Sequence, residues 1–147
     1  MKIVVASDHA GFEGPEPHYK PEIITHLKRR GLEVLDCGAF GPEAVDYPDY
    51  AQKACDAILR GEADMGVLIC GTGIGVSIAA NRNKGIRAAT CVTPDMAAMS
   101  RTHNNANIIC LGRRILPLDE CLKLIDVFLD TPFSEGERHI RRIRKMD

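Results

Sequence analysis

The sequence contains no tryptophan, and aromatic residues make up only 5% of its 147 positions. The 19 Lys and Arg residues nearly balance the 20 Asp and Glu residues, which leaves a net charge of −1. Proteins that bind nucleic acid rely on a basic surface and on aromatic side chains that stack with bases. We therefore do not expect nucleic acid as a partner.

Long apolar segments are missing as well. No run approaches the roughly 18 apolar residues that a membrane-spanning helix needs, so we expect no contact with a membrane. The apolar residues 3–6 are too few for the core of a signal peptide. The six cysteines include no C-x-x-C pair, and most lie inside apolar runs, which argues against a disulfide framework or a zinc site. These absences predict a cytoplasmic protein.

Short β-branched runs alternate with helical periods along the chain, a pattern typical of a parallel sheet covered by helices. The predicted strands are nearly continuous in apolar residues, as expected when both faces of a sheet are covered. We place them at residues 2–7, 32–37, 65–70, 87–92 and 107–111. The sequence thus predicts one α/β domain over residues 1–147: a three-layer αβα sandwich with a five-stranded, Rossmann-like parallel sheet and an additional C-terminal helix.

Helices are predicted between the strands from apolar periodicity and from start signals such as Thr93 before Pro94. They are expected at residues 21–30, 50–60, 76–81 and 94–103, and along the stripe of Leu118, Leu122, Ile125 and Leu129. Three prolines and a glycine between Gly14 and Pro21 exclude a regular helix before Pro21.

A last helix is predicted from Ser134 to about Lys145. Ser134 and Glu137 have the spacing of a capping box, with Ser134 as the N-cap. Residues 138–147 carry a net charge of +4, so the other 137 residues carry −5. Arg138 and Arg142 are four residues apart on one helical face, where two guanidinium groups repel each other unless an anion lies between them. A solvated basic tail is the alternative, but the capping box favours an ordered helix that binds phosphate.

Ligands of open α/β sheets bind beyond the carboxyl ends of the strands, so the polar segments near those ends are the first candidates. Three such segments stand out, and we expect the fold to bring them to one edge of the sheet. They are Ser7–Phe12, Cys70–Ser77 and His103–Asn107.

Glycines alternate at positions 71, 73 and 75, between an apolar strand and a helix. Such a turn aims backbone N–H groups at a ligand near a helix N-terminus and favours an oxyanion. It matches neither a Walker loop nor G-x-G-x-x-G, and tight packing of strand against helix would explain the glycines equally well. The cysteine at position 70 favours a catalytic role for this turn over simple packing. A helix N-terminus stabilises a thiolate, which can act as nucleophile or general base. We interpret the other five cysteines as small buried hydrophobes.

His103 lies in a polar cluster without apolar periodicity. An imidazole close to a thiolate can move protons at neutral pH. A solvated helix end is the alternative reading. From these residues alone, His103 is only a slightly better candidate for proton transfer than His9. His9 follows Asp8 and could merely cap a turn.

Five segments together resemble ribose-5-phosphate isomerase type B, whose wider family includes galactose-6-phosphate and allose-6-phosphate isomerases. The resemblance covers residues 1–12 and about 22–146. The segments that carry it are Ser7–Phe12, Asp46–Pro48, Cys70–Gly75, Ser77–Asn81 and Ser100–Asn104.

The resemblance implies isomerisation of ribose 5-phosphate to ribulose 5-phosphate through an enediolate, without a metal or a cofactor. It implies that Cys70 removes the proton next to the carbonyl, that His103 helps to open the furanose ring and that Thr72 assists the proton movement. The backbone of the glycine turn would stabilise the enediolate oxygen. The turn residues concerned are Gly71, Gly73, Ile74 and Gly75. The sugar hydroxyls would be held by Asp8, Tyr47 and Asn104. The phosphate would be held by His9, Arg138 and Arg142, with Arg114 as a weaker candidate.

The resemblance also implies a homodimer or homotetramer with the active site at the subunit interface. The tail at 134–147 would then pack on a partner subunit, which supplies the C-terminal arginines. The chain departs from the family in the Pro-rich stretch 14–21 and in Glu137, which replaces a family glycine. Allose or galactose 6-phosphate is the alternative substrate. A non-catalytic, flavodoxin-like module that binds a nucleotide or flavin is the alternative class of protein.

Overall fold

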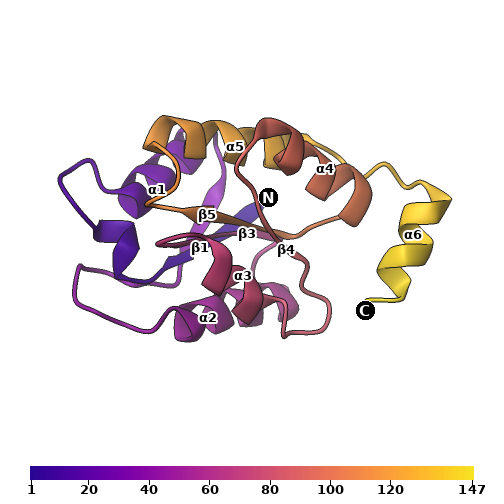
Figure 1. Cartoon of the computed structure of the whole chain (residues 1–147), viewed down its shortest axis with the longest axis horizontal. Coiled ribbons are helices and arrows are strands. Elements are labelled where there is room, and N and C mark those ends of the chain that lie inside the picture. The colour runs from indigo at the N-terminus through magenta and orange to yellow at the C-terminus, as the bar shows by residue number, and fades with distance from the viewer.

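The computed structural model describes all 147 residues (Figure 1). Its five strands are parallel and lie in the order β2-β1-β3-β5-β4, so β2 and β4 are the edges of the sheet. The elements are β1 (Lys2–Ser7), the short 3₁₀ helix η1 (His9–Phe12), α1 (Tyr19–Arg29), β2 (Glu33–Asp36), α2 (Tyr47–Leu59), β3 (Met65–Cys70), α3 (Ile74–Ala80), β4 (Ala88–Thr90), α4 (Pro94–Asn104), β5 (Ile108–Gly112), α5 (Leu118–Asp130) and α6 (Glu137–Arg144).

Helices cover both faces of the sheet, which confirms the predicted three-layer αβα sandwich. Figure 1 shows α1, α4 and α5 on one face and α2 and α3 on the other. Successive side chains of a strand point to opposite faces, so β1 contributes Ile3 and Val5 to one buried cluster and Val4 and Ala6 to the other. None of the helices is both long and apolar enough to cross a bilayer.

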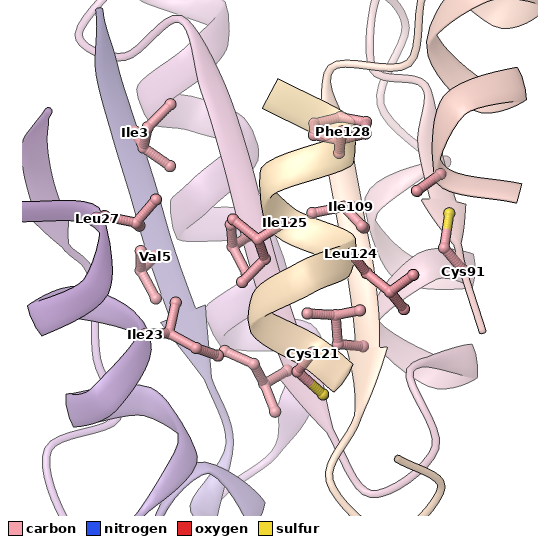
Figure 2. Close-up of a cluster of buried hydrophobic side chains, with 14 of the residues drawn as sticks. Ile3, Val5, Ile23, Leu27, Cys91, Ile109, Cys121, Leu124, Ile125 and Phe128 are labelled. Carbon is pink, nitrogen blue, oxygen red and sulfur yellow. The ribbon is translucent and has the colours of Figure 1, made fainter. Parts of the chain in front are cut away.

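The cluster under α1 and α5 holds the larger side chains. Figure 2 shows Ile23 and Leu27 of α1 and Ile125 and Phe128 of α5 on the same face of the sheet as Ile3 and Val5, all of them fully buried. Burying one such side chain contributes about 1.5–3 kcal/mol. The opposite cluster is built from small residues of α2, among them Ala51, Ala54 and Ala57.

Three helices begin earlier than the sequence predicts. The exclusion of helix before Pro21 is wrong, because α1 begins at Tyr19 and Pro21 lies in its first turn. An N–H group in that turn has no partner within the helix, so proline is tolerated there. Similarly, α2 begins at Tyr47 with Pro48 in its first turn, and α3 begins at Ile74.

The predicted capping box at Ser134 is also wrong. The N-cap of α6 is Gly136, and no side chain caps this helix. Ser134 Oγ instead donates to the carbonyl oxygen of Thr102 in α4, at 2.6 Å. Glu135 has a φ of 57°, a left-handed conformation that interrupts any helix between Ser134 and Glu137. The tail is nevertheless helical, and α6 stands apart from the sandwich, beyond the end of α4 (Figure 1).

Candidate active site

Cys70 and Asp8 lie side by side at the carboxyl ends of the two central strands. The Asp8 N–H donates to the carbonyl oxygen of Ile69 at 3.3 Å, which joins the end of β1 to β3. After β1 the chain turns outward to β2, whereas β3 has β5 on its other side. The crevice at such a switch point is where open α/β sheets bind their ligands. Cys70 ends β3 at this switch point, with only 4% of its surface exposed.

The glycine turn is built around Gly73. Its N–H donates to the Sγ of Cys70 at 3.2 Å. Gly73 has a φ of 79°, and a Cβ at this position would lie 2.9 Å from the carbonyl carbon of Leu111. Only glycine fits between β5 and the thiol. The neighbouring Thr72 accepts the Ile74 N–H at its Oγ1, at 3.2 Å, and so has its hydroxyl proton free to donate.

Three more of the predicted substrate-binding residues surround this turn. Tyr47 covers it, because a Cβ on Gly75 would lie 2.8 Å from two atoms of the Tyr47 ring. Asp8 uses one carboxylate oxygen to cap η1, accepting the Ala10 N–H at 2.9 Å, and its second oxygen makes no hydrogen bond. His9 accepts the backbone N–H of Val45 at Nδ1, at 3.3 Å. The proton of the neutral ring therefore sits on Nε2, which is a donor.

Arg114 lies over Gly71, where an added Cβ would be 3.0 Å from its Nη1. Its Nη2 donates to Glu13 at 2.6 Å and its Nε donates to both carboxylate oxygens, at 3.0 and 3.1 Å. These hydrogen bonds lower the pKa of Glu13 and raise the pKa of Arg114. The sequence analysis did not single out Glu13. Its position directly before the Pro-rich stretch is the one signal that could have done so.

The remaining thiols have different environments. Cys55, Cys91, Cys110 and Cys121 are buried, as predicted, whereas Cys37 is only half-buried. Desolvation raises the pKa of Cys55 and of Cys91 to about 11 and that of Cys121 to about 12. It also raises the pKa of Cys110 well above its usual range. These four behave as inert core residues.

We expected His103–Asn107 to lie with the other two polar segments at the carboxyl ends of the strands. This expectation is wrong. The carbonyl oxygen of Asn107 accepts the N–H of Gly66, near the amino end of β3, at 2.9 Å. Cys70 lies four residues further along this strand, about 13 Å away at 3.3 Å per residue. His103–Asn107 lies there because α4 runs antiparallel to the strands, as crossover helices do. The C-terminal end of α4 therefore lies near the amino ends of the strands. Within one chain His103 is remote from Cys70.

His103 has a different set of neighbours, provided by α6. Its ring stacks on that of His139, with centroids 4.6 Å apart and planes 10° from parallel. Both rings and Arg138 line a hollow of about 510 Å³. Glu137, the residue in which the chain departs from the family, lines the same hollow. Desolvation and the positive charge of Arg138 lower the pKa of His139.

The predicted site residues therefore form two separate groups. We call the first the thiol cluster; it comprises Asp8, His9, Tyr47, Cys70, Gly71, Thr72, Gly73, Ile74, Gly75 and Arg114. We call the second the histidine cluster; it comprises His103, Asn104, Arg138, His139 and Arg142. Within it, His139 was missed by the sequence analysis, because only its place next to Arg138 marked it. No three His, Cys, Asp or Glu side chains gather as ligands for a metal ion.

Comparisons with known proteins agree with one another. Residues 3–146 match a family model described as Ribose/Galactose Isomerase. Ribose-5-phosphate isomerase B of Escherichia coli is 44% identical over 97% of this chain and 91% of its own length. A ribose 5-phosphate isomerase structure from Thermotoga maritima has 53% identity and a TM-score of 0.93, over 99% of this chain and 97% of that one. The structure of ribose-5-phosphate isomerase B from Clostridium thermocellum has 49% identity and a TM-score of 0.94, over 99% of this chain and 95% of that one.

Proposed function

The chain belongs to the ribose/galactose isomerase family, and on that premise we propose that it interconverts ribose 5-phosphate and ribulose 5-phosphate through an enediolate. One observation carries the proposal: the Cys70 thiol lies at the switch point of the sheet and accepts the Gly73 N–H. This is the position and the environment that a cysteine base requires.

In the proposed reaction, Cys70 removes the proton from C2 of the open-chain aldose. The electron pair forms the C1–C2 double bond, and the carbonyl oxygen at C1 takes up the negative charge. Backbone N–H groups of the glycine turn stabilise that oxygen as the charge develops. Thr72 then helps to move the hydroxyl proton from the oxygen at C2 to the oxygen at C1. The carbonyl forms at C2, and the electron pair of the double bond takes the proton back from the thiol at C1. The product is the 2-ketose, and no redox partner is needed.

The ring-opening histidine and the phosphate-binding arginines of α6 come, in this proposal, from a second copy of the chain. These groups are His103, Arg138 and Arg142 of the histidine cluster. The cluster lies toward the amino ends of the strands, whereas Cys70 lies at the carboxyl end of β3. A two-fold axis beside the edge strand β4 would place the histidine cluster of each copy against the thiol cluster of the other. Exposed apolar side chains of α3, α4 and the β4–α4 loop flank this edge and would be covered. They are Ile74, Ile78, Val92, Met96 and Met99.

The test compares Cys70→Ala with a matched thiol variant, Cys37→Ala, in an assay of ribulose 5-phosphate formation. Cys70→Ala is expected to abolish turnover while still binding ribose 5-phosphate, as measured by calorimetry. Cys37→Ala is expected to keep wild-type turnover. Turnover by Cys70→Ala at the wild-type rate would refute the role of the thiol.

The substrate is tested separately, with a panel of ribose, allose and galactose phosphates compared by kcat/KM. We expect ribose 5-phosphate to have the highest value. A higher value for a hexose 6-phosphate would change the substrate and leave the chemistry at Cys70 in place.

A further inference from the structure

One arginine outside both clusters, Arg87, connects the segments that carry the histidine cluster. It directly precedes β4, and 17% of its side chain is exposed. Its Nε donates to the carbonyl oxygens of Asn104 and Asn105 at 3.0 and 3.2 Å, at the end of α4. Its Nη1 donates to the carboxylate of Asp147, just beyond α6, at 2.6 Å. Its backbone N–H donates to the side chain of Asn107 at 2.8 Å.

The contacts at α4 fix the end of the helix that bears His103. Carbonyl groups in the last turn of a helix have no partner within it and carry partial negative charge, so a guanidinium satisfies both their hydrogen bonding and the helix dipole. Asn105, with a φ of 44°, ends α4 in the left-handed conformation. Arg87 therefore holds the C-terminal turn of α4, and with it the backbone of His103 and Asn104.

The contact with Asp147 fixes the far end of the tail. The near end is held to α4 by the bond from Ser134 to Thr102 and by the stacking of His139 on His103. Arg138 and Arg142 lie between these two attachments. Because α6 stands beside α4 and not on the sheet (Figure 1), its orientation depends on the attachments at its ends.

We propose that Arg87 is a positioning residue of the histidine cluster: it sets where His103 and the α6 arginines stand relative to each other. This inference rests on the proposed function, in which that cluster completes the site of a second copy. In this role Arg87 acts through the backbone of α4 and through Asp147. Its rigid fork of donors can serve two segments at once, which a lysine cannot do in the same geometry. A displacement of about 1 Å in a positioned group can lower a rate about a hundredfold.

The first test is kinetic and uses Arg87→Gln with Arg82→Gln as the matched control. Arg82 lines the same groove beside the tail, but its side chain makes no hydrogen bond. We expect Arg87→Gln to lower kcat/KM for ribose 5-phosphate about tenfold or more and Arg82→Gln to leave it unchanged. Asp147→Asn weakens the tail attachment alone from an exposed position, and we expect a smaller loss. Wild-type kinetics for both Arg87→Gln and Asp147→Asn would overturn the inference.

The second test asks which half of the site Arg87 serves. Two variants are co-expressed with different affinity tags, and oligomers that carry both tags are purified. Cys70→Ala with Arg87→Gln is expected to regain activity, because one thiol cluster and one histidine cluster stay intact and face each other. His103→Ala with Arg87→Gln is expected to be no more active than Arg87→Gln alone, because both histidine clusters are damaged.

These outcomes separate the inference from the proposed function. A His103→Ala pair more active than Arg87→Gln alone, or a Cys70→Ala pair no more active than Arg87→Gln alone, would overturn the role of Arg87. The pair of Cys70→Ala with His103→Ala tests the two-chain site itself. Failure of that pair would refute the shared site, and the inference would fall with it. If Arg87→Gln does not fold, Asp147→Asn takes its place in the same pairings.

Discussion

Replacing Gly73 with alanine tests the geometry of the turn that holds Cys70. A left-handed backbone costs a residue with a Cβ about 1–2 kcal/mol. The new Cβ would also lie 2.9 Å from the carbonyl carbon and 3.2 Å from the nitrogen of Leu111, backbone atoms of β5 that cannot rotate away. Overpacking of this kind costs about 1–3 kcal/mol, so Gly73→Ala is expected to lose about 2–5 kcal/mol of stability.

Gly61→Ala is the matched control, because Gly61 has a φ of 72° but nothing within 4 Å of an added Cβ. It should lose the backbone contribution alone, about 1–2 kcal/mol, and keep full activity. Urea denaturation gives the two free energies of unfolding, and the isomerase assay gives the two rates. Gly73→Ala should be the less stable variant and should lose activity, since the Gly73 N–H moves away from Cys70. Equal stability together with wild-type turnover would refute the reasoning.

Two further predictions concern the core and the tail. Phe128→Ala removes a fully buried ring and is expected to cost about 3–5 kcal/mol in urea denaturation, whereas a loss below about 1 kcal/mol would contradict the assigned core. His139 has a pKa below its ordinary 6.5, so the unfolded chain takes up this proton before the folded one does. The free energy of unfolding is therefore expected to fall as the pH drops below about 6.5, and to fall less in His139→Gln. If the two proteins lose the same free energy between pH 7.5 and 5.5, His139 does not contribute to this pH dependence.

Burial on both faces explains which strands could be predicted. The bounds of β1 and β3 match the prediction from sequence, because these central strands are apolar almost throughout. The edge strands β2 and β4 are shorter than predicted, and their residues are only partly buried or exposed. At an edge, apolar residues continue past the last ladder hydrogen bond, so sequence pattern alone does not mark where the strand ends.

The arrangement of the site divides in the same way. The position of Cys70 follows from local sequence, because a thiol that ends a central strand must lie at the carboxyl edge. The bonds of Glu13 to Arg114 and of Arg87 to Asp147 join residues 101 and 60 positions apart. No local pattern encodes such pairs. Ser134 shows the converse: it fits a capping box, but its hydroxyl finds a partner on α4.

In the proposed oligomer, one active site takes its base from one chain and its histidine from another. Cys70→Ala and His103→Ala, each alone, are expected to lower turnover about 10²–10⁴-fold, as loss of a proton-transfer group does. The measurement is the turnover of purified oligomers that contain both variants. The account predicts about half of wild-type activity, because one of every two sites is restored. Activity no higher than that of either variant alone would contradict it.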